Sequence, residues 1–190
     1  WIKKGEILEE LGNYSESIEA FNRAKKINPD YASNPKYSTD PTDPNAWSLK
    51  GQALFSQRKI NESLRAYDRA IELNPRDGNN WAAKGRALDG QGKFNESIEA
   101  FEKAIELNPK APSYWMSKAG ALANLGLKNE SIQAYEKAIQ LNPNDANRWA
   151  AKGRALDGQG KFNESIEAFE KAIELNPKYV YAWKGRKNDS

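Results

Sequence analysis

Apolar residues along this chain recur at helical spacing, in segments that are separated by short polar turns. Trp81, Gly85 and Leu88 are four and three residues apart, which places them on one face of a helix. Gly92 is suited to the left-handed conformation that ends a helix, and Asn95 is placed to cap the next one. A second apolar face follows, formed by Ile98, Phe101, Ala104, Ile105 and Leu107. The pattern therefore predicts an antiparallel pair of helices.

This pair of helices repeats along the chain. Successive tryptophans from Trp47 to Trp183 are 34 residues apart, and Trp1 precedes Trp47 by one period with twelve residues inserted. We predict ten helices and no strand, with the helices at 1–11, 14–27, 46–57, 60–73, 80–91, 94–107, 114–125, 128–141, 148–159 and 162–175. The chain divides into a truncated first unit at 1–31, an inserted loop at 32–43, four units at 44–77, 78–111, 112–145 and 146–179, and the start of a sixth unit or a tail at 180–190.

The repeated columns carry a resemblance to a known family. A period of 34 residues with Trp, Gly, an aromatic residue, Ala and Pro at these places resembles the tetratricopeptide repeat (TPR), over residues 1–31 and 44–179. The resemblance implies an all-α solenoid of five antiparallel helix pairs in a right-handed superhelix. It also implies that the first helices line a concave groove that binds a peptide or a segment of a partner protein.

The expected groove is lined by first-helix residues on the side opposite the tryptophans. We expect the alanines among them to leave an open floor, on which Arg and Asp are the specific polar groups. The alternative is a solvated face on which Arg86 pairs with Asp89. The Lys and Asn with which some members of the family bind the C-terminal carboxylate of chaperones are absent from the corresponding first-helix positions. We therefore do not expect a receptor for chaperone tails. The candidate residues are Asn79, Ala82, Arg86, Asp89, Asn147, Ala150, Arg154, Asp157, Ser117, Gln52 and Phe55.

Other columns depart from the family pattern. Ser stands where Ala is usual, and Arg58 replaces the Gly between two helices. A lysine column replaces Leu in all five units, at Lys4, Lys50, Lys84, Lys118 and Lys152. Because all units share it, we predict that it serves packing, with its ammonium groups in water or at a helix C-terminus; a basic ladder for acidic ligands is the alternative.

Four Asn-Glu-Ser triplets match the N-glycosylation pattern, at Asn61, Asn95, Asn129 and Asn163. We interpret them instead as a helix cap followed by a small packing residue. The chain shows no basic stretch followed by an apolar one near residue 1, so no secretion signal supports glycosylation, and we expect a cytoplasmic protein.

Composition narrows the possible chemistry. The chain has no cysteine and no histidine, which removes disulfides, thiolate metal sites and the commonest general base. We therefore predict no enzyme activity, no cofactor and no metal. The net charge of +3 comes entirely from residues 178–190, so we expect no nucleic-acid partner. No apolar run approaches the roughly 18 residues that a membrane span requires, so we expect no membrane partner.

Together these features predict a non-catalytic protein–protein interaction scaffold. The alternative is a regulatory or substrate-recruiting TPR region of a larger enzyme, because the sequence starts within a repeat at Trp1 and stops a few residues into another. Incomplete units at both ends expose faces that normally stack on a neighbour. We therefore expect weak head-to-tail self-association of this chain.

Overall fold

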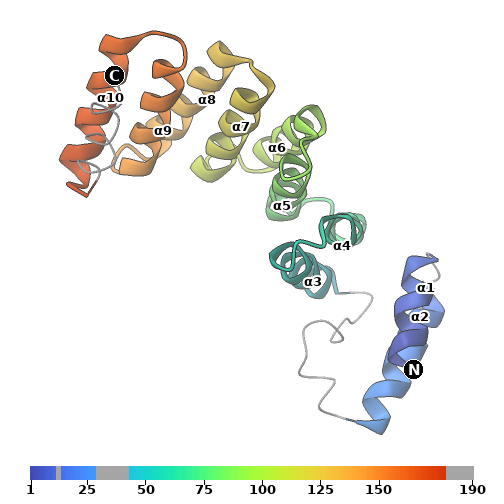
Figure 1. Cartoon of the computed structure of the whole chain (residues 1–190). Coiled ribbons are helices and arrows are strands. Elements are labelled where there is room, and N and C mark those ends of the chain that lie inside the picture. Colours follow the sequence, from blue (N-terminus) through green and yellow to red (C-terminus); the bar gives the residue numbers. More distant parts are fainter. Residues whose placement is uncertain (12–13, 29–42, 179–190) are drawn as a thin grey trace. The chain divides into compact units, whose positions relative to one another are not determined.

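The computed structural model describes residues 1–11, 14–28 and 43–178, and within these residues it contains α-helices and no β-strand (Figure 1). The predicted insertion at 32–43 apart from Asp43, and the whole of the predicted sixth unit or tail at 180–190, lie outside the described residues. The helices are α1 (Ile2–Glu10), α2 (Tyr14–Ile27), α3 (Pro44–Ser56), α4 (Ile60–Leu73), α5 (Gly78–Asp89), α6 (Phe94–Leu107), α7 (Pro112–Leu125), α8 (Lys128–Leu141), α9 (Ala146–Asp157) and α10 (Phe162–Leu175).

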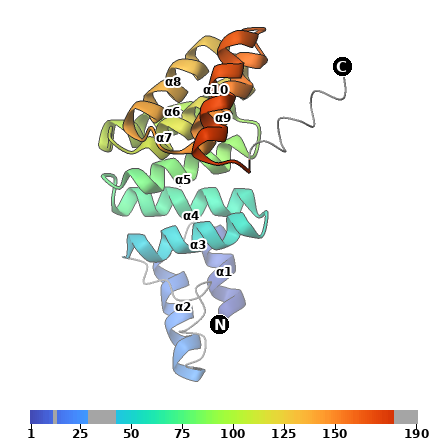
Figure 2. The same cartoon turned by 90° about the vertical axis from the view of Figure 1, so that its left-hand side faces the viewer.

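The chain forms two compact units, Trp1–Gln91 and Gly92–Ser190, with the boundary between α5 and α6. In the first unit α1 packs against α2, α3 against α4, and α5 against α4. In the second unit each helix from α6 to α10 packs against the next one along the chain (Figure 2). Packing between neighbours in sequence, repeated along each unit, is the arrangement of a helical solenoid.

The first helix of each pair begins about two residues earlier than its predicted start from α3 onward. The cause is visible at Asp43, Asp77 and Asp145, which precede these helices and accept a hydrogen bond from the backbone N–H two residues later, each at 2.9 Å. This is N-capping, which satisfies a donor that the helix leaves free. Pro44 and Pro112 occupy the first turns of α3 and α7, where a missing N–H costs nothing.

The turns between paired helices follow the predicted glycine pattern. Gly92 has φ +75°, as predicted, and the same turn at Gly126 and Gly160 has φ of +90° and +75°. Arg58 adopts this left-handed conformation with φ +61°, although it has a side chain. The predicted cap at Asn95 is wrong: Lys93 precedes α6 without a capping side-chain hydrogen bond, and Asn95 lies in the first turn.

In the pairs α3–α4 and α9–α10 an aromatic ring packs on the backbone of the first helix. Tyr67 of α4 lies so close to α3 that a Cβ on Gly51 would be 2.6 Å from its Cε1 atom. Phe169 of α10 lies against Gly153 of α9 in the same way, at 3.1 Å. At Gly51 the close approach of this ring leaves no room for a side chain, whereas the contact at Gly153 is looser.

Buried serines fasten the same pairs of helices, which explains why Ser replaces the usual Ala. Each serine hydroxyl donates to a first-helix carbonyl twelve residues earlier, at 2.8–2.9 Å. The pairs are Ser17 with Gly5, Ser63 with Gly51, Ser131 with Ala119 and Ser165 with Gly153. The prediction of a small packing residue was incomplete, since a hydroxyl is what these positions use.

The tryptophan column holds each first helix to the turn before it. The indole N–H donates to a proline carbonyl six residues earlier, at 3.1, 3.0 and 2.8 Å for Trp81, Trp115 and Trp149. The rings of Trp115 and Trp149 also pack against clusters that include residues of α8, so the Trp and Pro columns both hold one repeat to the next.

Candidate functional site

The two predicted arginines project from the first helices into solvent. Arg86 of α5 and Arg154 of α9 are both exposed, and no ion pair or hydrogen bond joins either guanidinium to another described residue. The alternative of a pair between Arg86 and Asp89 is therefore not observed. Free guanidinium groups on an exposed helix face are available to a ligand, with five donors in a fixed planar geometry.

The alanines beside these arginines do not form an open floor, which corrects the expectation from the sequence. Ala82 and Ala150 are only 1% and 0% exposed. Small side chains at these two positions allow neighbouring helices to approach closely. The alanines are therefore covered and do not form the expected floor of a groove. A ligand on this face therefore contacts the longer side chains around them.

The remaining predicted residues divide between surface and core. Asn79 and Asn147 are exposed in the first turns of α5 and α9, and Gln52 is exposed on α3. Phe55 is half-buried and packs against a cluster that includes Tyr67, so it supports the core of its unit. The other three are half-buried: Asp89, Asp157 and Ser117.

Each arginine lies close to a buried tyrosine of the preceding helix. Burial raises the pKa of Tyr67, while a hydrogen bond with Ser63 and the positive charge of Arg86 partly offset this rise in pKa. Burial likewise raises the pKa of Tyr135, and the charge of Arg154 partly offsets it. The same pairing of a guanidinium with a neutral phenol thus occurs once in each compact unit.

Tyr67 and Tyr135 were not among the predicted site residues, although the repeats carry a signal for them. Arg stands at its first-helix position only in the two units that follow a Tyr in the aromatic column. The units that follow Phe21 and Phe101 have Gln52 and Gly120 there instead. In both cases Arg therefore follows a repeat whose aromatic residue is the buried Tyr, which links the two residues in the sequence.

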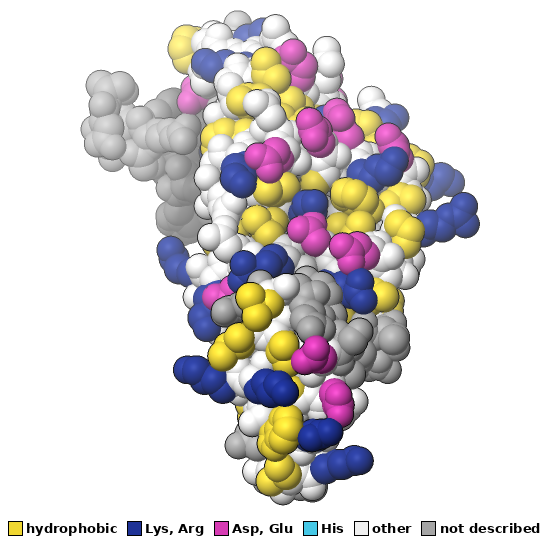
Figure 3. Space-filling view, turned by 90° about the vertical axis from the view of Figure 1, so that its right-hand side faces the viewer, with side chains coloured by type: hydrophobic (Ala, Val, Ile, Leu, Met, Phe, Trp, Pro, Cys, Tyr) yellow, Lys and Arg dark blue, Asp and Glu magenta, His cyan; other side chains and the backbone are white. Residues whose placement is uncertain are grey.

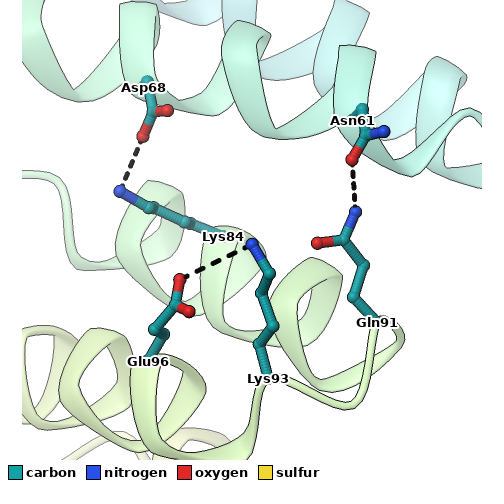
Figure 4. A network of polar contacts seen from close by, with 6 residues as sticks. All are labelled: Asn61, Asp68, Lys84, Gln91, Lys93 and Glu96. Atoms are coloured by element: carbon teal, nitrogen blue, oxygen red, sulfur yellow. Dashed lines mark hydrogen bonds and ion pairs between the residues drawn. The ribbon is translucent and has the colours of Figure 1, made fainter.

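Lysines of the repeated column form ion pairs with carboxylates of the neighbouring helix. Lys84 of α5 reaches Asp68 of α4 at 2.7 Å (Figure 4), and its ammonium lies 5.7 Å from the Trp81 ring centroid. The equivalent ion pairs are Lys118 with Glu102 at 2.7 Å and Lys152 with Glu136 at 2.8 Å. The acid lies on the second helix of the preceding pair, instead of a helix C-terminus or water as predicted. These contacts favour the packing interpretation over a basic ladder, because each of these three ammonium groups already has a carboxylate.

Two asparagines of the Asn-Glu-Ser triplets bridge to the following pair of helices. Gln91 donates to the side-chain oxygen of Asn61 at 2.5 Å (Figure 4), and Gln159 donates to that of Asn129 at 3.1 Å. The two partners are thirty residues apart in each case. These amide bridges give the asparagines a structural use other than the predicted cap.

Charges of both signs are mixed on the face of the described residues that Figure 3 draws, where Lys and Arg side chains are interspersed with Asp and Glu. Those residues contain no group of three potential metal ligands. None of their helices is long and apolar enough to cross a membrane.

Comparison with known proteins agrees with the repeat architecture. Tetratricopeptide repeat family profiles match residues 1–31, 44–77, 82–146 and 146–179. No curated protein sequence matches the chain. Among solved structures, MamA is similar with a TM-score of 0.70 at 20% identity, covering 93% of this chain and 96% of that one.

Two further structures show the same fold. YrrB, described as a TPR protein with an unusual peptide-binding site, has a TM-score of 0.69 at 16% identity, covering 98% of this chain and 90% of its own. A thermophilic TPR protein of Thermus thermophilus, TTC0263, has a TM-score of 0.64 at 19% identity, covering 94% of this chain and 91% of its own.

Proposed function

Since the chain belongs to the tetratricopeptide repeat family, we propose that it is a non-catalytic interaction scaffold that holds a segment of a partner protein on its first helices. Repeats of this kind are interaction modules, and the structure described for YrrB includes a peptide-binding site. In our proposal each compact unit offers its own position for a peptide segment, at Arg86 on α5 in the first unit and at Arg154 on α9 in the second.

The arginine–tyrosine pair is the observation that carries the proposal. An exposed guanidinium without a partner has donors to offer, and the neutral tyrosine beside it leaves its positive charge uncompensated. A carboxylate on a peptide satisfies both conditions with a bidentate, charge-assisted hydrogen bond. The preferred partner is therefore a peptide segment with Asp or Glu side chains.

The two arginine–tyrosine pairs coincide with a duplicated segment of the chain. Residues 81–110 and 149–178 are identical, so the duplicated segment carried its arginine with it. Tyr67 and Tyr135 precede the two copies, and each compact unit thereby has one complete pair. A partner with two acidic segments gains avidity from engaging both, if its linker spans them.

The test begins with selection of binders from a random 12-residue peptide display library, using the 190-residue chain as bait. We expect the selected peptides to be enriched in Asp and Glu. Reversing both charges with Arg86→Glu and Arg154→Glu should weaken binding at least about tenfold, because one charge-assisted hydrogen bond is worth roughly 1.5–3 kcal/mol.

Arg65 provides a matched control, because it is an exposed arginine on the second helix α4. Arg65→Glu changes the net charge by as much as either single reversal, Arg86→Glu or Arg154→Glu, but leaves the first-helix residues intact, so affinity should change little. If the selected peptides bound the double variant as tightly as the original chain, the partner site would not include these arginines and the proposal would fail.

A further inference from the structure

A groove lies on the other side of the second compact unit, between the second helices α6 and α8, with α7 beneath it. Its volume is about 650 Å³, within the roughly 300–1,000 Å³ typical of ligand sites. Its lining is mainly apolar and includes Ile98, Trp115, Leu122, Leu125, Leu127 and Ala134. None of these residues belongs to the first-helix face with the arginines.

The junction at this groove lacks a side-chain bridge that two equivalent junctions have. Gln159 donates to Asn129 between α8 and the turn before α10, and Gln91 donates to Asn61 in the first unit. The residue that corresponds to these glutamines in the fourth repeat is Leu125. It lines the groove together with Asn95, which therefore faces a side chain that cannot donate a hydrogen bond.

A second substitution makes the same place more apolar. The repeats at 44–77, 78–111 and 146–179 have lysine two residues after the glutamine, whereas the fourth repeat has Leu127. This side chain is 41% exposed at the edge of the groove. Packing within the repeat does not require leucine at either position, since three other repeats fold with Gln and Lys there.

The charges around the groove are unevenly compensated. Glu102 is neutralised by Lys118 at 2.7 Å, but Glu99 and Glu130 line the groove without an ion pair to any described residue. Lys137 also lines it, seven residues beyond Glu130 along α8, which is about 10 Å at the rise of a helix. The end near Leu127 and Glu130 is therefore acidic, and the other end is basic.

We propose that this groove is a second binding site, for a short peptide segment of a partner protein that carries a large apolar side chain with Lys or Arg next to it on one side. The apolar side chain of the peptide lies on Trp115, Leu125 and Leu127, where it is removed from water. The basic side chain lies at the acidic end, against Glu99 and Glu130. This ligand has the opposite charge to the acidic peptide proposed for the arginines, so the two faces select different segments.

The experiment uses the 190-residue chain and two blocked tetrapeptides with one charge each, acetyl-Lys-Trp-Leu-Ser-amide and acetyl-Glu-Trp-Leu-Ser-amide. Binding is followed by methyl NMR at Leu122, Leu125 and Leu127. The cationic peptide should shift these resonances saturably, whereas the anionic one should bind at least about tenfold more weakly. Equal binding of the two peptides, or no binding by either, would overturn the proposal.

The chain itself supplies a variant that should restore the amide bridge and make the groove less apolar. Leu125→Gln with Leu127→Lys installs the residues of the fifth repeat, which folds with Gln159 and Lys161, and circular dichroism verifies that helix content is retained. The cationic peptide should bind this variant at least about tenfold more weakly. Glu99→Gln with Glu130→Gln should keep the apolar contacts and abolish the preference for cationic over anionic peptide. Undiminished binding to the first variant, or an undiminished charge preference in the second, would refute the assignment.

Discussion

Adding one methyl group to Gly51 should destabilise the first compact unit, whereas the same change at Gly153 should not destabilise the second. An alanine Cβ at residue 51 would lie 2.6 and 2.7 Å from Cε1 and Cδ1 of Tyr67. The ring cannot retreat easily, because Tyr67 is only 4% exposed and packs against Ala83 and Ala87 of α5. Overpacking of this kind costs about 1–3 kcal/mol.

The helix itself favours alanine and so reduces the net effect. Replacing Gly by Ala inside a helix contributes about 1 kcal/mol of stability, so Gly51→Ala should lower the free energy of unfolding by up to about 2 kcal/mol. At Gly153 the nearest ring atoms of Phe169 are 3.1 Å away, and this ring is only half-buried. A shift of a few tenths of an ångström relieves the contact, so Gly153→Ala should be neutral or stabilise by up to about 1 kcal/mol.

Urea unfolding followed by circular dichroism measures the free energy for each variant. Hydrogen exchange of α3–α4 and α9–α10 is needed beside it, because repeat arrays open locally as well as globally. The fourth repeat carries Ala119 at this column beside Tyr135, so alanine is compatible with the helix pair when the ring is placed differently. Equal effects of the two substitutions would refute the argument that the ring-to-backbone distance decides the outcome.

Three further predictions concern the turns, the lysines and the ends. Arg58→Gly should raise the free energy of unfolding by about 1 kcal/mol in urea titrations, because glycine relieves the left-handed strain at φ +61°; no change would mean that the turn stores no strain. Lys84→Met with Lys152→Met should leave peptide affinity, measured by calorimetry, unchanged. The free energy of unfolding should change by less than about 2 kcal/mol, since exposed ion pairs contribute about 0–1 kcal/mol each. Lost affinity at constant stability would favour the basic ladder. We also propose weak head-to-tail association of this 190-residue chain through a face that includes Phe162, which is 63% exposed. Sedimentation equilibrium should detect this association, and Phe162→Ser should weaken it. A strict monomer at millimolar concentration would refute the proposal.

The local architecture of this protein was readable from its sequence because it depends on spacing along the chain. The apolar periodicity and the 34-residue repeat predicted the helix pairs, and the second helices begin and end as predicted from α4 onward. Gly92 was predicted as the left-handed residue because only a residue without a side chain adopts that conformation freely. The starts of the first helices were less accurate, because the aspartate caps were not used in setting them.

Contacts between helices were decided by the tertiary structure. The pairing of Lys152 with Glu136 and the bond from Ser165 to Gly153 join residues sixteen and twelve positions apart on different helices. A helical period describes which face a residue occupies, but not which side chain of the next helix lies opposite. The burial of Ala82 and the groove at Leu125 depend on how closely neighbouring helices pack. They are therefore known only from the tertiary structure.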